Sequence, residues 1–207
     1  MQQYLWWGIG VFTGICLIWY FFFSGVSVKR FANYPPQNET IVAFGDSLVQ
    51  GVGATQDNDL FSQVSAKIGM RIINKGVSGN TTADGLARVD EVIALKPGVV
   101  IVVLGGNDYL RQVPKEDTFA NLRAIVRRLQ EVGAVVVVVG VRGGLLSDHF
   151  EPLYEELAAD LKTGYVPNIL KGLLTRQEYM ADSIHPNDKG YAIIAEKIAP
   201  LLLEIYE

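Results

Sequence analysis

The sequence predicts an α/β domain, layered around a central parallel sheet and preceded by one N-terminal transmembrane helix. Apolar, β-branched runs alternate with segments of helical period from residue 40 to about residue 200. The two strongest runs, Val99–Leu104 and Val135–Val139, are continuous, as expected of strands that are covered on both faces. No Asp, Glu, Lys or Arg occurs before Lys29, which separates an uncharged segment from an ordinary charged domain.

The elements of the domain follow from these runs and from the residues that bound them. Strands are expected at Thr40–Phe44, Arg71–Asn74, Val99–Leu104, Ala134–Val141 and Tyr165–Ile169. Helices are expected at Leu60–Ile68, Ala83–Leu95, Phe119–Val132, Pro152–Leu161 and Asp188–Ile198. Asp117 or Thr118 is expected to cap the third of these helices and Gly133 to end it. Pro152 suits a first helical turn, and Pro200 is expected to end or bend the last helix.

The uncharged N-terminal segment predicts a retained membrane anchor. Tyr4–Val28 spans 25 residues, and roughly 20 apolar residues cross the hydrocarbon layer. Aromatic residues near both ends resemble interfacial anchors: Trp6, Trp7, Trp19 and Tyr20. A cleaved secretory signal is the alternative, but a signal has a basic start and a shorter apolar stretch.

The organisation that follows is an anchor over residues 1–30, a polar, proline-containing tether over residues 31–39 and a domain over residues 40–207. Lys29 and Arg30 directly follow the span, so the positive-inside rule favours an inner-membrane protein with its domain on the cytoplasmic face. Long domains translocate regardless of such charges, which leaves the periplasmic face open.

Composition excludes several classes of function. The 207 residues carry 18 basic and 22 acidic side chains, and the net charge of −4 argues against a nucleic-acid partner. One cysteine forms no intrachain disulfide, and a composition of one cysteine and two histidines argues against a His/Cys metal site. No metal or cofactor is therefore expected.

A serine after the first strand is the first candidate catalytic residue. Ser47 comes just past Thr40–Phe44, and ligands of parallel sheets bind beyond the carboxyl ends of the strands. A serine hydroxyl needs a base, and the chain has two histidines. His149 lies in an irregular stretch and is expected to be a solvated loop residue, whereas His185 precedes the last helix. Asp182, three residues earlier, can fix the tautomer of that imidazole.

Two further loops could supply hydrogen-bond donors to a developing oxyanion. Gly79 follows the second strand, and glycine lets a backbone N–H approach a ligand closely. Asn107 follows the third strand, and its amide is a neutral donor. With the N–H of Ser47, these groups would place three donors around one oxygen atom. Taken singly, Gly-Asn pairs are turn signals more often than catalytic groups.

Together the loops resemble the four sequence blocks of the SGNH, or GDSL, hydrolase family. The matching segments, in family order, are Gly45-Asp46-Ser47-Leu48, Gly79, Gly105-Gly106-Asn107-Asp108 and Asp182-Ser183-Ile184-His185-Pro186. The segments around Gly79 and Asn107 are most similar to the bacterial thioesterase I/lysophospholipase L1/arylesterase group.

The resemblance implies a three-layer, doubly wound, flavodoxin-like domain without metal or cofactor. It implies Ser47 as nucleophile, His185 as general base and acid, and Asp182 as the orienting carboxylate. The oxyanion hole would consist of the N–H groups of Ser47 and Gly79 and the side chain of Asn107.

Substrate contacts are less defined by the sequence. The candidates are Asp46, Leu48, Tyr109 and Leu145, the last in a glycine-containing loop after the fourth strand that is expected to shape the acyl pocket. Arg111 follows closely and is expected to be solvated.

The leading functional hypothesis is a membrane-anchored serine esterase that acts on lipid-derived or aryl esters and thioesters. Its partners would be the small acyl substrate and, through residues 4–28, the membrane. One alternative is a carbohydrate or envelope-polymer deacetylase with the same triad. Another, from a different class, is a non-catalytic membrane-anchored binding protein.

Overall fold

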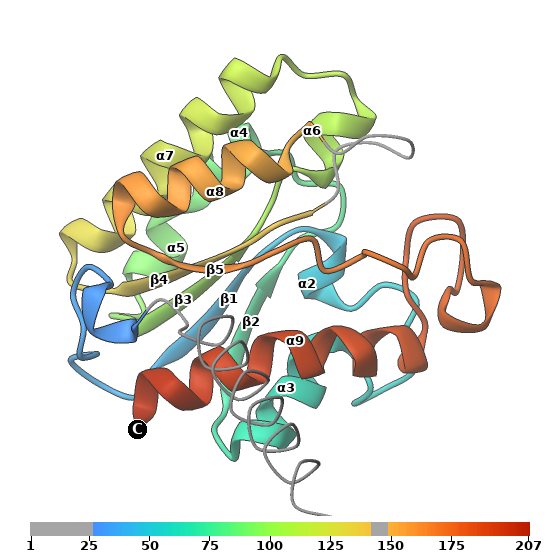
Figure 1. Cartoon of the computed structure of the whole chain (residues 1–207), viewed down its shortest axis with the longest axis horizontal. Coiled ribbons are helices and arrows are strands. Elements are labelled where there is room, and N and C mark those ends of the chain that lie inside the picture. The colour runs from blue at the N-terminus through green and yellow to red at the C-terminus, as the bar shows by residue number, and fades with distance from the viewer. Residues whose placement is uncertain (1–26, 142–148) are drawn as a thin grey trace, which may run out of the picture.

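A five-stranded parallel sheet organises the chain, which the computed structural model describes over residues 27–141 and 149–207 (Figure 1). The strands, in the spatial order β2-β1-β3-β4-β5, are listed here: β1 (Ile41–Gly45), β2 (Ile72–Gly76), β3 (Val99–Val103), β4 (Val135–Val139) and β5 (Gly164–Val166). This is the doubly wound order of flavodoxin-like folds. All five expected strands are present, each within a few residues of its expected bounds.

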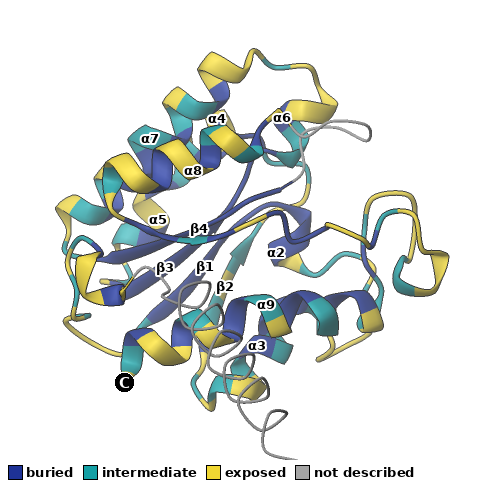
Figure 2. Cartoon of the chain, in the orientation of Figure 1, coloured by how far each residue is buried: buried dark blue, intermediate teal, exposed yellow. Residues whose placement is uncertain are grey.

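Helices cover both faces of the sheet, which gives three layers (Figure 1). One face packs against α3 (Leu60–Ile68) and α9 (Asp188–Tyr206). The other packs against α4 (Thr82–Arg88), α5 (Asp90–Ile93), α7 (Lys115–Glu131) and α8 (Glu151–Leu161). Figure 2 shows the buried strands between helices whose outer sides are exposed.

The alternation of side chains along the strands divides the core into two apolar clusters. In β1, Ile41 and Ala43 point to the α3/α9 side, and Val42 and Phe44 point to the α7/α8 side. All five residues of β1, β3 and β4 are buried, as their continuous apolar runs predict.

Three expected helix boundaries are wrong. The segment Ala83–Leu95 forms two helices, because α4 ends at Arg88 and α5 begins at Asp90. The third helix begins at Lys115, so Asp117 and Thr118 lie inside its first turn and do not cap it.

The last helix continues through Pro200 to Tyr206, beyond the expected end at Ile198. Its apolar side lies on the sheet on both sides of the proline, with Ile198 and Leu202 buried, so tertiary packing offsets the lost N–H bond. Pro152 does lie in the first turn of α8, and Gly133, at φ +88°, follows the end of α7.

The segment before β1 packs on the domain, although the sequence predicts a tether there. Val28 begins the 3-10 turn η1 (Val28–Arg30), and Val28 and Phe31 are buried in the α3/α9 cluster. The N–H of Ala32 donates to the carbonyl of Lys162 at 2.8 Å. Ordered packing therefore begins upstream of residue 40.

Within the two described stretches, no helix combines the length and apolar character needed to span a bilayer. The expected span over residues 4–28 lies outside those stretches except for Ser27 and Val28. Leu145 and the rest of the loop over residues 142–148 also lie outside the described residues.

Candidate active site

The carboxyl end of β1 carries Ser47. This serine is the first residue of the short helix α2 (Ser47–Gln50), and the carboxylate of Asp46 caps that helix by accepting the N–H of Leu48 at 3.0 Å. Gly45 has no room for a side chain, since a Cβ there would lie 2.2 Å from the carbonyl oxygen of Val103. The turn from β1 to α2 therefore fixes the backbone on both sides of Asp46 and places Ser47 at the carboxyl-terminal edge of the sheet.

His185 and Asp182 approach Ser47 from the loop before α9. The Nε2 atom of His185 lies 3.0 Å from Ser47 Oγ, and Nδ1 lies 2.7 Å from Asp182 Oδ2. The hydrogen bond from His185 lowers the pKa of Asp182 to about 2, so this carboxylate is ionised at neutral pH. A hydroxyl, an imidazole and a carboxylate thus form one continuous chain of hydrogen bonds.

The three predicted oxyanion donors belong to α2, to the loop between β2 and α4, and to α6. Gly79 has φ +80°, a conformation that favours glycine. Asn107 lies in α6 (Gly106–Leu110), at the same edge of the sheet as α2 (Figure 1). Among contacts of the described residues, the N–H groups of Ser47 and Gly79 donate to no protein acceptor. Both groups remain available to a ligand.

Two side chains tie the Gly79 loop to its neighbours. Gln50, the last residue of α2, accepts the N–H of Ser78 at 2.7 Å. The Asn107 amide donates to the carbonyl of Asn80 at 3.0 Å. Gly79 is therefore held between α2 and α6, the helices that carry Ser47 and Asn107.

Two buried acids lie beneath these loops. Asp46 is 2% exposed, and burial raises its pKa to about 7. Asp108, fully buried, accepts the N–H and the hydroxyl of Thr82 at 2.8 and 2.5 Å, which ties α6 to the start of α4. Within residues 27–141 and 149–207, no group of three or more His, Cys, Asp or Glu side chains is placed to hold a metal ion.

Comparison with known proteins identifies this arrangement. The GDSL-like Lipase/Acylhydrolase family matches the chain over residues 43–193, which contain every site residue named above. The chain belongs to this family. It is an SGNH/GDSL-type hydrolase.

Relatives of this hydrolase carry names of ester-cleaving enzymes. Esterase TesA of Pseudomonas aeruginosa is 30% identical over 176 residues, which cover 79% of this chain and 88% of TesA. Thioesterase 1/protease 1/lysophospholipase L1 of Escherichia coli K12 is 27% identical over 178 residues, 79% of this chain and 83% of that protein. A solved crystal structure of TesA superposes with a TM-score of 0.74 at 29% identity and covers 80% of this chain and 99% of the other.

A cavity of about 350 Å³ opens beside the triad of this GDSL hydrolase. Ser47, Asn107 and His185 are among the residues that line it. The rest of its lining is mainly apolar: Leu48, Tyr109, Leu110, Val141, Leu170, Leu174 and Ile184. The cavity can therefore accept an apolar group next to the Ser47 hydroxyl.

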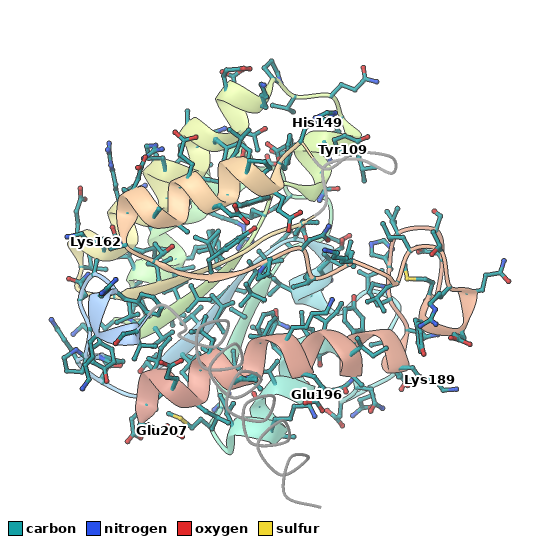
Figure 3. All side chains as sticks on the ribbon, in the orientation of Figure 1. Tyr109, His149, Lys162, Lys189, Glu196 and Glu207 are labelled. Atoms are coloured by element: carbon teal, nitrogen blue, oxygen red, sulfur yellow. The ribbon has the colours of Figure 1, made fainter. Side chains whose placement is uncertain are left out.

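Three of the four expected substrate contacts line this cavity, namely Asp46, Leu48 and Tyr109. Sequence reasoning missed Leu170 and Leu174, which come from the long segment between β5 and α9. His149 lies exposed near Tyr109 (Figure 3), and the neighbouring Phe150 packs edge-to-face on the Tyr109 ring at 6.0 Å.

Two arginines have roles that the sequence did not reveal. Arg88 donates from Nη2 to the carbonyl of Gly45 at 2.7 Å and from Nε to the side chain of Asn80 at 2.6 Å. It therefore joins the end of β1, just before Ser47, to the loop that contains Gly79. Arg111, expected to be only solvated, donates to the carbonyl of Gly79 at 2.8 Å. The bonds to the carbonyls of Gly45 and Gly79 join residues 43 and 32 positions apart, so no local sequence pattern predicts them.

Proposed function

We propose that this GDSL hydrolase is a membrane-anchored serine hydrolase that cleaves carboxylic esters or thioesters of lipid-derived or aryl substrates through an acyl-serine intermediate. The observation that carries the proposal is the position of His185, with Nε2 3.0 Å from Ser47 Oγ and Nδ1 2.7 Å from Asp182 Oδ2. The apolar cavity and the names of the relatives support acyl compounds as the substrate class.

In the acylation step, Ser47 Oγ attacks the acyl carbonyl carbon while His185 Nε2 accepts the hydroxyl proton. The carbonyl oxygen becomes an oxyanion, which the N–H groups of Ser47 and Gly79 and the Asn107 amide stabilise. Asn107 Nδ2 also lies 3.5 Å from Asp46 Oδ2, a long and weak contact that an oxyanion can replace. The imidazolium then donates its proton to the departing alcohol or thiol.

In the deacylation step, His185 takes a proton from water, and the resulting hydroxide attacks the acyl-serine ester. Collapse of the second oxyanion releases the carboxylic acid, and the imidazolium returns a proton to Ser47 Oγ. Asp182 remains ionised throughout and stabilises the imidazolium in both steps.

The test is activity and labelling of the full chain in detergent. Wild-type protein should hydrolyse p-nitrophenyl acyl esters and react covalently with a fluorophosphonate at Ser47. Ser47→Ala should lose the label and at least about 10³-fold in turnover. Ser65→Ala, on α3 outside the site, serves as the matched control and should keep both. Full turnover by Ser47→Ala contradicts the proposal.

The same assay separates the alternatives. Hydrolysis of acetylated sugars with no activity on medium-chain acyl esters would favour a carbohydrate or envelope-polymer deacetylase. Absence of labelling in folded wild-type protein would favour a non-catalytic binding protein.

The membrane anchor rests on the sequence of residues 4–28, which contain no charged side chain. We expect the protein in the inner-membrane fraction after alkaline carbonate extraction, with its N-terminus intact by mass spectrometry. A signal peptidase product would contradict the anchor. Reporters fused after Glu207, at the surface end of α9, should be active on the cytoplasmic side, and a reporter active only in the periplasm would reverse the orientation.

A further inference from the structure

Two side chains, one from α6 and one from the residue that caps its C-terminus, hold the consecutive carbonyls of Gly79 and Asn80. The Asn107 amide donates to the carbonyl of Asn80 at 3.0 Å, and Arg111 Nη2 donates to the carbonyl of Gly79 at 2.8 Å. Residues four apart lie on the same face of a helix, so one face of α6 contacts the loop at two adjacent peptide groups.

Arg111 is also hydrogen-bonded to Asn107, the residue that would contribute the third oxyanion donor. Its backbone N–H donates to the carbonyl of Asn107 at 2.9 Å, where it ends α6. Its guanidinium is exposed, and within the described chain no carboxylate lies at ion-pair distance from it. Among the described residues, the carbonyl of Gly79 is therefore the hydrogen-bond acceptor of this guanidinium. In addition to the hydrogen bonds that Asp84 accepts, the charge of the guanidinium also helps to lower the pKa of that carboxylate.

This contact acts on a glycine, whose backbone is intrinsically free to rotate. Glycine has wide conformational freedom, and Gly79 adopts φ +80°. A Cβ at Gly79 would lie 3.5 Å from Arg111 Nη2, so the guanidinium packs closely over the Cα of this glycine. The carbonyl belongs to the Gly79–Asn80 peptide and the N–H to the Ser78–Gly79 peptide. Holding the carbonyl, together with the bond from the Ser78 N–H to Gln50, restricts the backbone rotations that would reorient the N–H of Gly79.

We infer that Arg111 is a positioning residue for the oxyanion hole, which keeps the N–H of Gly79 directed at the oxygen that Asn107 also binds. The inference rests on the proposed function, because it assigns the Gly79 N–H to a developing oxyanion. Arg111 acts through Gly79, so its contribution is larger in the transition state than in the substrate complex.

The test compares Arg111→Met, which keeps the length of the stem but removes the donors, with Arg111→Lys, which keeps one charged donor. We expect Arg111→Met to lower kcat by about 10- to 100-fold, less than the loss of a whole donor, with KM changed by less than about threefold. Arg111→Lys should recover part of the loss. Arg127→Ala, an exposed arginine on α7, is the control.

Inhibition by an alkylboronic acid, whose serine adduct is tetrahedral, gives a second readout. Its Ki should rise in parallel with the fall in kcat/KM for Arg111→Met and stay constant for Arg127→Ala. Wild-type kcat and Ki in Arg111→Met, or a loss expressed in KM alone, would overturn the positioning role.

Two further outcomes are distinguishable. If wild-type protein neither labels with fluorophosphonate nor hydrolyses esters, the proposed function itself fails. If Arg111→Met does not fold, Arg111→Lys decides: a partial fall in kcat with a parallel rise in Ki at an unchanged melting temperature supports positioning, whereas wild-type kcat and Ki, or a loss of stability in proportion to activity, overturns it.

Discussion

Asp182 holds His185 through both of its carboxylate oxygens. Oδ2 lies 2.7 Å from Nδ1 of the imidazole, and Oδ1 accepts the backbone N–H of the same histidine at 2.8 Å. Oδ1 also accepts the N–H of Ile184 at 2.8 Å, which closes the local turn. One carboxylate thus fixes the backbone that carries His185 as well as the tautomer and orientation of its ring.

The first prediction concerns Asp182→Asn. The amide can retain the backbone contacts through its oxygen, but it no longer stabilises the imidazolium and can stabilise the wrong tautomer. We expect kcat to fall by about 10²- to 10⁴-fold with KM little changed. Steady-state kinetics on a p-nitrophenyl ester measure this, with Asp160→Asn on α8 as the control. Wild-type kcat in Asp182→Asn would remove Asp182 from the triad.

The second prediction concerns Asp46, whose pKa burial raises to about 7 from 3.8. Between these values the unfolded chain releases the proton and the folded chain keeps it, so this group lowers the free energy of unfolding as the pH rises from about 4 to 7. Asp46→Asn keeps the helix cap and removes the effect. It should be the more stable protein above pH 7, by at most about 4 kcal/mol at about 1.4 kcal/mol per pKa unit.

Urea unfolding of wild type and Asp46→Asn at pH 5 and pH 8 measures this difference. The advantage of the variant should be larger at pH 8. Asp59→Asn, at the N-cap of α3, measures what the same substitution does at another helix start. An equal difference at both pH values would show that Asp46 does not bind its proton in this range.

The third prediction concerns Tyr154, which supports the loop that leads into α6. Its ring is 1% exposed, and its hydroxyl donates to the carbonyl of Leu104 at 2.6 Å, just before Gly105. Tyr154→Phe leaves a buried acceptor without this donor, so the free energy of unfolding should fall by about 1–3 kcal/mol. Urea denaturation at neutral pH measures it.

Tyr206→Phe provides the matched control for this prediction. The buried hydroxyl of Tyr206 has no hydrogen-bond partner within the described chain. Its removal should leave stability unchanged or slightly raised. Equal losses in the two variants would show that the contact with Leu104 contributes nothing specific.

The positions of the main site residues could be predicted because they depend on the topology of the sheet more than on individual side-chain contacts. Ser47 and His185 are 138 residues apart in the sequence. The sequence nevertheless places both at the carboxyl edge of one parallel sheet, because Ser47 directly follows a strand and His185 directly precedes the last helix. The positions of the strands could also be predicted from the sequence, because β3 and β4 are uninterrupted runs of β-branched, apolar residues.

What the sequence could not reveal depends on tertiary contacts. The break between α4 and α5 falls after Arg88, whose guanidinium reaches the carbonyls of Gly45 and Lys75. Arg111 reads as a solvated side chain because its acceptor, Gly79, is 32 residues away. Leu170 and Leu174 lie in a segment without helical or strand period, so no pattern assigns them to the cavity wall.

The last prediction concerns the length of acyl chain that the site accepts, which the cavity wall containing Leu170 and Leu174 should limit. Each methylene that enters an apolar cavity contributes up to about 0.8 kcal/mol, so kcat/KM should rise by up to about fourfold per added methylene and level off where the chain leaves the 350 Å³ cavity. Leu174→Trp narrows the cavity and should move this plateau to shorter esters without abolishing acetate hydrolysis. Leu203→Trp, on the exposed side of α9, should keep the wild-type profile. An unchanged profile in Leu174→Trp would mean that the acyl chain binds elsewhere, because a tryptophan in the occupied cavity competes with the chain for the same space.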